Sequence, residues 1–436
     1  MMADRPVKFT PTTAGASVSA YPGPDDIQRV ELPNGIVVLS RINTNSPAVV
    51  IKGYLPAGGL NDPDRLLGLA DFCATALLRG TENYDFHQIY DRLESAGARL
   101  GMSSGVHLVN FSGQSLVEDL DMLLDLLAEG LRRPTFPDGQ VERLRAQLLT
   151  GLAIRSQSTR DMAGLSFDQI VYEDHPYSRP SDGYTETVAA ITGSDLAGHH
   201  REYYGPRGMV ITIVGAVEPE AAVERVRAHF GDWLNPGQGE LKPLPLLKRL
   251  TETITRRVDI AGKSQTDIVL GAAGPSRLED DYIAATLGNS VLGRFGMMGR
   301  IGASVRDRAG LAYYAHSSLS GGLGPGPWYV SAGVDPENVD KAIELILDEL
   351  SRFIQDGVTG EELADVQNQF IGSLPLSLES NAGVASALVT MERYQLGLDY
   401  LRRYPEMIGS ITRQDVLEAA HRYLDVDRLG IAVAGP

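Results

Sequence analysis

Hydrophobic and polar positions along the chain follow two periods, one typical of strands and one typical of helices. Two short apolar runs, 29–32 and 36–40, flank Pro33-Asn34-Gly35, whose Asn-Gly pair predicts a hairpin with a type I′ turn. A third strand is predicted at 48–55, and longer segments of helical periodicity follow it. Locally paired strands with helices grouped between them predict an α+β fold with mostly antiparallel sheets, each covered by helices on one side.

The same order of elements occurs twice, at a shift of 220 residues. The segment I-T-G-S-D at 191–195 corresponds to I-T-R-Q-D at 411–415, and the apolar run 209–215 corresponds to 429–435. Each half is therefore predicted to close with a helix and then a buried strand. Two interpretations stay open: a gene duplication with one packed surface between the halves, or a clam-like pair that encloses a cleft.

Further inside each half, a strand is followed by a helix, predicted at 118–132 in the first half and at 337–352 in the second. Thr359 and Glu362 have the spacing of a capping box, so a further helix should begin there. We expect the following division: an N-terminal extension at 1–28, a first α+β repeat at 29–234, a Gly- and Pro-rich linker at 235–247 and a second α+β repeat at 248–436.

Composition indicates a globular protein of two or more domains, since the 436 residues are 43% hydrophobic and 22% charged. No apolar run approaches the roughly 18 residues of a membrane span. The N-terminus also lacks the apolar core of a secretory signal, so we expect a cytoplasmic protein, although a signal removed beforehand would leave the same sequence. The net charge of −17 argues against nucleic acid and would attract basic peptides. The single cysteine, Cys73, excludes an intrachain disulfide and a thiolate metal cluster.

The segment 68–81 reads G-L-A-D-F-C-A-T-A-L-L-R-G-T. It resembles the G-L-A-H-F-L-E-H-x-L-F-K-G-T segment of the pitrilysin/insulinase-type peptidases, which are inverted H-x-x-E-H zinc enzymes. In that family two histidines on one helical face bind zinc, and the glutamate between them activates the bound water. The resemblance places Asp71, Ala74 and Thr75 at these three positions, and it places the third zinc ligand, a glutamate of a later helix, at or beside Thr150.

These replacements imply that the chain holds no zinc and no other cofactor of its own. A catalytic zinc site uses three protein ligands, and only Asp71 could contact a metal. The stretch 143–160 contains no carboxylate, and none of the eight histidines lies three or four residues from another. The motif segment can also be interpreted as an apolar helix of the core, with Leu69, Phe72 and Leu77 buried.

A second motif lies in the second half, where 300–313 reads R-I-G-A-S-V-R-D-R-A-G-L-A-Y. It resembles the family's R-L-x-x-x-L-R-E-x-x-G-L-A-Y. The resemblance implies that Arg306 and Tyr313 bind substrate across the cleft, Arg306 through peptide carbonyls and Tyr313 through the developing oxyanion. Alternatively, Arg306 pairs with a nearby acid and Tyr313 merely packs. Of two flanking glycine-rich stretches, 293–299 and 321–327, the first is either a substrate-guiding loop, as in the non-catalytic subunit of mitochondrial processing peptidase, or an ordinary loop at a helix end.

In bacterial two-subunit members of this family, one chain supplies the zinc motif and the other supplies the Arg/Tyr pair. The resemblance therefore implies a non-catalytic subunit of a heterodimeric zinc metallopeptidase, with a homologous zinc-bearing subunit as its partner and unfolded peptides as substrates. The isolated chain is not expected to be an enzyme, whereas the complex is expected to be a metalloendopeptidase. Two alternatives remain: a purely structural or peptide-binding homodimer, as for the related core subunits of a respiratory complex, and an enzyme with an unfamiliar site around Asp71.

Overall fold

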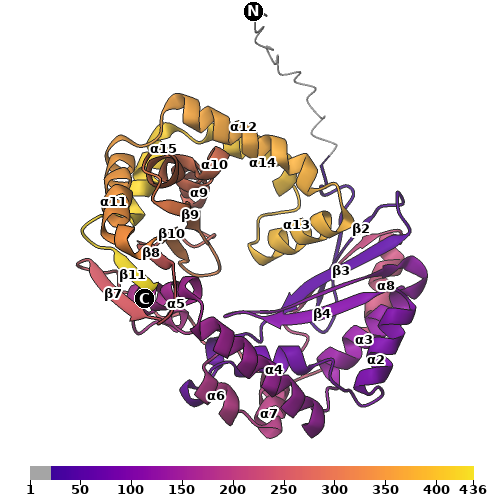
Figure 1. Cartoon of the computed structure of the whole chain (residues 1–436). Helices are drawn as coiled ribbons and strands as arrows, with labels where there is room; N and C mark the ends of the chain where they lie inside the picture. The colour runs from indigo at the N-terminus through magenta and orange to yellow at the C-terminus, as the bar shows by residue number, and fades with distance from the viewer. Residues whose placement is uncertain (1–20) are drawn as a thin grey trace, which may run out of the picture.

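A computed structural model describes residues 21–436, so most of the expected N-terminal extension at 1–28 lies outside the described residues. The chain forms one six-stranded and one five-stranded sheet, both covered by helices. Figure 1 shows the first half, from indigo to magenta, and the second half, from orange to yellow, curving toward each other like two arms. The predicted α+β fold with two similar halves is confirmed. No helix within 21–436 has the length and apolarity that a bilayer span requires.

The sheet of the first half has the strand order β1-β2-β6-β3-β5-β4, and all its neighbours are antiparallel except β2 and β6. It is mostly antiparallel, as predicted. Its strands are β1 (Gln28–Glu31), β2 (Val37–Ile42), β3 (Ala48–Leu55), β4 (Arg99–Ser104), β5 (Val109–Leu116) and β6 (Val210–Gly215).

The turn between β1 and β2 is not the type I′ turn that the sequence predicted. A type I′ turn needs positive φ at both Asn34 and Gly35, but only Gly35 has it, at 91°. The Gly35 amide donates to the Leu32 carbonyl at 2.9 Å, which closes a turn with Pro33 and Asn34 at its centre. Proline favours the first central position of a type I turn, and the following glycine then takes the left-handed conformation.

Helices cover one face of this sheet and bury a continuous leucine-rich core. Leu123, Leu127 and Leu131 of the third helix lie in this core with Ile51 and Phe111 of the strands. The helices of the first half are α1 (Leu69–Ala76), α2 (Phe86–Ser95), α3 (Leu120–Arg132), α4 (Asp138–Ser156), α5 (Thr159–Val171), α6 (Thr185–Ala190), α7 (Gly193–Tyr203) and α8 (Pro219–Phe230).

The sheet of the second half has the order β7-β11-β8-β10-β9, with one parallel pair, β7 and β11. Its strands are β7 (Ile254–Asp259), β8 (Thr266–Ala273), β9 (Ala312–Leu319), β10 (Pro327–Val334) and β11 (Gly430–Gly435). Its helices are α9 (Tyr282–Gly293), α10 (Phe295–Ile301), α11 (Val339–Asp356), α12 (Gly360–Ser377), α13 (Asn381–Arg393), α14 (Tyr400–Ser410) and α15 (Arg413–Tyr423). The predicted capping box of Thr359 and Glu362 begins α12.

The internal repeat is reproduced in the structure at its predicted shift. The helices α7 and α15 begin 220 residues apart, as do the strands β6 and β11 that close the two halves. Thr192 and Asp195 form a capping box at the start of α7, and Thr412 and Asp415 form the same box at the start of α15. Equivalent sequence signals therefore produce equivalent helix starts.

The two halves exchange a helix, which the sequence did not predict. The helix α5 of the first half packs on the sheet of the second half, where Phe167 and Ile170 bury themselves against Ala432 and Ala434 of β11. Small side chains on β11 allow the helix to approach closely, since a Cβ on Gly430 would come within 2.8 Å of Val171. The prediction that helices cover each sheet on one side only is therefore incomplete, because it did not include a helix from the other half.

The reciprocal contact is made by α13 of the second half, which packs on β3 and β6 of the first sheet (Figure 1). Val384 and Leu388 lie in a buried cluster with Val214 of β6. At the end of α13, Glu392 accepts two hydrogen bonds from Arg29 of β1, at 2.8 and 2.9 Å. Apolar packing and a bidentate ion pair thus fasten this helix to the other half.

No helix or strand lies between α8 and β7, the region that contains the predicted linker at 235–247. Part of this region is held on the first half, since the buried Gln238 accepts a hydrogen bond from the Arg207 amide at 3.0 Å. The residue limits of the two repeats stay a prediction.

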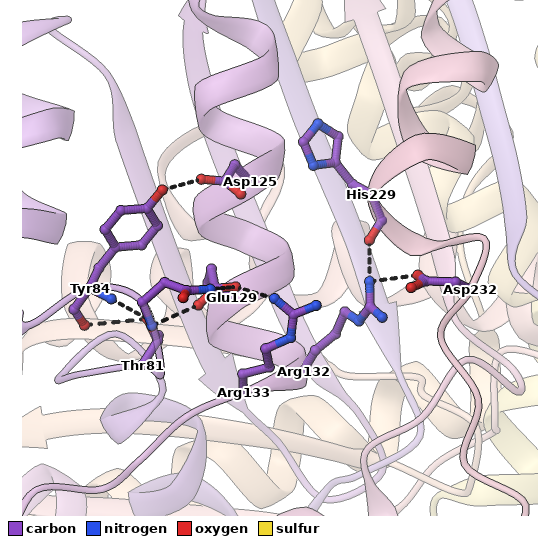
Figure 2. A network of polar contacts seen from close by, with 9 residues as sticks. Thr81, Tyr84, Asp125, Glu129, Arg132, Arg133, His229 and Asp232 are labelled. Atoms are coloured by element: carbon purple, nitrogen blue, oxygen red, sulfur yellow. Dashed lines mark hydrogen bonds and ion pairs between the residues drawn. The ribbon is translucent and has the colours of Figure 1, made fainter.

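A polar network ties the segment that follows α1 to the helix α3 (Figure 2). Tyr84 donates its backbone amide to the Thr81 hydroxyl at 3.1 Å. Glu129 of α3, only 3% exposed, accepts hydrogen bonds from Arg133 at 2.7 Å and from the Asn83 side chain at 3.0 Å. A buried carboxylate with several donors fixes the end of the motif segment.

Replacing Glu129 with alanine should lower the free energy of unfolding by about 1–3 kcal/mol, because the hydrogen bonds that Asn83 and Arg133 donate to this buried carboxylate are lost. The matched control is Asp232→Ala, which breaks a 2.9 Å ion pair with Arg132 from a side chain that is 74% exposed. It should cost below about 1 kcal/mol. Urea unfolding measures both, and equal losses would show that the buried network adds nothing beyond a surface pair.

Candidate functional site

The motif helix α1 is held in the core of the first half. Leu69, Phe72 and Leu77, the positions predicted to be buried, are all fully or nearly fully buried. The carboxylate of Asp62 accepts a hydrogen bond from the Ala70 amide at 3.1 Å, so it caps the helix start. The core interpretation of this segment is confirmed.

Asp71 lies on the less buried face of α1, in a strongly desolvated place. Burial raises the pKa of its carboxyl to about 6, and the negative charge of Asp182 adds to this rise. A hydrogen bond from the Ser104 amide, at the end of the edge strand β4, opposes it. Asp71 therefore faces another carboxylate.

The other positions of the motif carry no group that needs a ligand. Ala74 is buried. The hydroxyl of Thr75 donates to the Asp71 carbonyl at 2.9 Å, and the hydroxyl of Thr150, exposed on α4, donates to the Ala146 carbonyl at 2.8 Å. Both hydroxyls are thus satisfied within their own helices.

Arg306 and Tyr313 lie at the edge of the second sheet. Arg306 is in a π-helical turn, Gly302–Arg308, and its side chain is 34% exposed with Asp307 as an ion-pair partner at 3.9 Å. Tyr313 is on the edge strand β9 and is 84% exposed. Neither side chain is packed away from solvent.

A cleft of about 1000 Å³ lies between the two halves, near these elements. We call it the inter-half cleft. The helix α5 forms one wall of the cleft, and β10 with the loop after β9 forms another. Asp182 also lines the cleft and extends its lining toward Asp71. Its lining contains none of Asp71, Thr75, Arg306 and Tyr313, and of its walls the sequence analysis named only the glycine-rich stretch 321–327.

The arginines of the inter-half cleft have polar partners, whereas the desolvated acid Asp168 has no ion-pair partner among residues 21–436. Arg155 contacts Asp182, and Arg160 donates to the Tyr314 hydroxyl at 3.1 Å. Asp168 of α5 has no ion pair within the described residues, and burial raises its pKa to about 7. No motif or spacing marks Asp168 in the sequence, because its setting depends on α5 packing against the other half.

The second glycine-rich stretch closes one side of the inter-half cleft. The Tyr172 hydroxyl donates to the Pro325 carbonyl at 3.0 Å, and a Cβ on Gly324 would lie 2.4 Å from the Tyr177 hydroxyl. Only glycine permits this close approach. The first stretch, 293–299, is not the loop that either interpretation expected, because it spans the end of α9 and the start of α10.

Comparison with protein families gives matches in both halves. Residues 37–182 match the model of the insulinase family, peptidase family M16, and residues 190–370 match the model described as the peptidase M16 inactive domain. Together they cover most of the chain. The protein belongs to the M16 peptidase family.

The curated relatives of this M16 chain include proteins named as uncharacterized zinc proteases. One from Mycobacterium leprae is 26% identical over 408 residues, which cover 94% of this chain and 91% of the relative. One from Streptomyces coelicolor is 25% identical over 418 residues, with coverages of 94% and 90%. Subunit 1 of the mitochondrial cytochrome b-c1 complex of Bos taurus is 22% identical over 271 residues, which cover 62% of this chain and 56% of that subunit.

Solved structures match the chain over nearly its whole length. A peptidase M16 inactive domain from Pseudomonas fluorescens superposes with a TM-score of 0.87 at 27% identity and covers 94% of this chain and 98% of that one. A protease from Helicobacter pylori also gives a TM-score of 0.87, at 19% identity, with coverages of 95% and 100%. The second match bears on the fold alone.

The residues at the M16 zinc-ligand positions do not fit a zinc ion. Of the positions that the resemblance gives to zinc ligands, Asp71 supplies one carboxylate, whereas Thr75 and Thr150 supply hydroxyls already bonded to carbonyls; Ala74, at the position of the water-activating glutamate, is aliphatic. Within residues 21–436 no group of three His, Cys, Asp or Glu side chains is arranged to hold a metal ion. This chain therefore has the M16 fold without the M16 ligand set in its described part.

Asp71→Asn should stabilise the protein at neutral pH and leave its stability unchanged below about pH 4. The folded state raises the pKa of this carboxyl from 3.8 to about 6, so it binds the proton more tightly than the unfolded chain does. The associated stability is complete below about pH 4 and is lost as the pH rises through about 6. Asparagine avoids this loss, and urea unfolding at pH 7.5 should give a gain of roughly 1–3 kcal/mol.

The control for this prediction is Asp91→Asn, which changes an exposed acid on α2. It should leave the free energy of unfolding unchanged at both pH values. A gain for Asp71→Asn of the same size at pH 4 and pH 7.5 would contradict the assignment to charge burial.

Proposed function

We propose that this chain is the non-catalytic subunit of a two-subunit zinc metallopeptidase, in which a homologous partner supplies the H-x-x-E-H zinc site. This chain closes the proteolytic chamber and helps to hold an unfolded peptide. Arg306 and Tyr313 contribute to substrate binding near the scissile bond. The isolated chain has no peptidase activity in this proposal, and the zinc belongs to the partner.

One observation carries the proposal: the motif helix keeps its place in an M16 fold while its ligand positions have lost their ligands. The apolar positions Leu69 and Phe72 are buried as the helix requires, and the resemblance assigns Asp71 and Thr75 to the positions of the two zinc-binding histidines. A fold that keeps its chamber without its metal ligands depends on another chain for catalysis.

The exposure of the Arg/Tyr pair supports a role in binding. A tyrosine that only packs would be buried, whereas Tyr313 is 84% exposed. The one ion-pair contact of Arg306, with Asp307, has a long separation of 3.9 Å, so most of its donors are available. Both residues lie beside the edge strand β9, whose outer backbone groups can pair with an extended peptide.

A purely structural or peptide-binding homodimer is the second candidate. The observation that favours it is the match to subunit 1 of the bovine cytochrome b-c1 complex, a protein named for its place in an assembly. In this case Arg306 and Tyr313 would have no effect on peptide turnover. The two candidates therefore differ in the composition of the native complex and in the kinetics of two variants.

Affinity purification of the chain from its native host, followed by mass spectrometry, should recover a homologous M16 chain with an intact H-x-x-E-H in near-equal amount. The physical reason is that residues 21–436 of this chain contain no fitting ligand set, so the proposed activity needs a second chain. Recovery of this chain alone, at the mass of a dimer, would favour the homodimer instead.

In the reconstituted complex, Tyr313→Phe should lower kcat by about a hundredfold, because one donor to the developing oxyanion is lost. Arg306→Ala should lower kcat/KM mainly through KM, because it removes donors to peptide carbonyls. The matched control is Arg308→Ala, an equally charged neighbour that is 65% exposed and lies 4.0 Å from Glu349. It should leave turnover of an unfolded peptide unchanged.

Unchanged turnover in both the Tyr313→Phe and the Arg306→Ala variant of an active complex would contradict the subunit assignment. Gel filtration with the partner is measured alongside, since a variant that loses the partner loses activity without any role in binding substrate.

A further inference from the structure

A second hollow, separate from the inter-half cleft, lies among helices of the second half. It has a volume of about 330 Å³ and is formed by α9, α12, α14 and the segment after α13. We call it the tyrosine pocket. Five aromatic side chains line it: Tyr282, Phe370, Tyr394, Tyr400 and Tyr404.

Arg277 enters the tyrosine pocket and is held there by stacking rather than by an acid. Its guanidinium lies over the rings of Tyr282 and Tyr394, with distances of 5.1 and 5.2 Å to the ring centres. Its Nε is buried and has no hydrogen-bond partner among residues 21–436. Stacking offsets part of the cost of burying the charge but satisfies none of the N–H donors.

The acids that could neutralise Arg277 are engaged elsewhere. Glu279, in the pocket lining, accepts hydrogen bonds from Arg422 at 3.0 Å and from the Tyr423 hydroxyl at 2.7 Å. The remaining acid of the lining, Asp280, is exposed to solvent. Arg277 thus has no ion pair within the described residues, in a chain whose net charge is −17.

The tyrosines add further donors to the pocket. None of the hydroxyls of Tyr282, Tyr394, Tyr400 and Tyr404 donates a hydrogen bond within the part of the chain that the structure describes. Burial raises the pKa of Tyr404 to about 12 and also raises the pKa of Tyr400, so both hydroxyls keep their protons. The pocket therefore offers the Arg277 guanidinium and four tyrosine hydroxyls as donors to a ligand.

We infer that the tyrosine pocket binds a carboxylate of a peptide, with Arg277 as the charged anchor between Tyr282 and Tyr394. A guanidinium stacked on aromatic rings presents its N–H groups at its edge, and this edge matches a planar carboxylate in a bidentate pair. The aromatic walls accept the apolar part next to the carboxylate. The carboxylate comes either from the C-terminus of the peptide or from an acidic side chain.

The glycine-rich stretch 321–327 lines the inter-half cleft and also contacts two residues that line the tyrosine pocket, Arg277 and Tyr282. The Arg277 amide donates to the Gly322 carbonyl at 3.0 Å, and a Cβ on Gly321 would lie 2.1 Å from the Tyr282 ring. The other side of this stretch lines the cleft, through Gly322 and Gly324 among others. The carboxylate site goes beyond the proposed function and does not rest on it, since binding needs neither zinc nor a partner.

The test is calorimetric titration of the full chain with two pairs of short unstructured peptides. The first pair is acetylated at the N-terminus and ends in leucine, as the free acid or as the amide. The second pair is blocked at both ends and contains one internal Glu or Gln. In one of the pairs the carboxylate member should bind at least about tenfold more tightly, and Arg277→Gln should abolish that ratio.

Two further variants keep the result interpretable. Arg249→Gln removes another arginine that stacks on a tyrosine, 5.1 Å from the ring centre of Tyr423 and outside the pocket, and it should preserve the ratio. Tyr404→Phe removes one donor without changing the packing, so it should reduce the ratio several-fold at an unchanged melting temperature. If Arg277→Gln fails to fold, the affinity ratio of the Tyr404→Phe variant decides whether the pocket binds the carboxylate. A ratio near one for both peptide pairs, or a ratio that survives in the folded Arg277→Gln variant, overturns the assignment.

Discussion

Each sheet of this protein has a face that its own half leaves uncovered, and burying that face requires a helix from the other half. The helix α5 fills this role for the second sheet and α13 fills it for the first, with Phe167 and Leu388 among the buried side chains. Burial of one such side chain stabilises the fold by about 1.5–3 kcal/mol. Separation of the halves would expose both clusters, so the exchange of helices fixes how the halves lie and thereby forms the inter-half cleft.

Polar contacts set the register of this exchange. At the start of α5, the Thr159 hydroxyl donates to the buried carboxylate of Asp267 at 2.6 Å, and the adjacent Arg160 reaches Tyr314 of the other half. A partly buried charged group is costly unless it is paired, so such contacts favour one alignment over a shifted one more than they add stability. The wall of the cleft is therefore positioned before any ligand binds.

Features encoded locally could be predicted from the sequence, and those that depend on distant contacts could not. The capping box at Thr359 needs only the next three residues, and the repeat needs only two matching segments. The prediction of a type I′ turn at Asn34 was wrong because Pro33, one residue earlier, favours another turn type. A helical pattern predicts that α5 buries a face but does not say against which sheet. The stacking of Arg277 on Tyr282 and Tyr394 likewise joins residues from separate elements, so no spacing reveals it.

The motif helix shows which of its positions the fold requires and which only a metal would require. Leu69 and Phe72 fill the core, so their loss would leave a cavity at a cost of several kcal/mol. Thr75 bonds to a carbonyl of its own helix, so it leaves no buried polar group unsatisfied and costs the fold little. Asp71 is the exception, because burial and Asp182 both oppose its charge. Packing alone thus explains why the helix is retained. Of the two ligand positions on this helix, only Asp71 carries an electrostatic cost, because its carboxylate is desolvated and lies near Asp182.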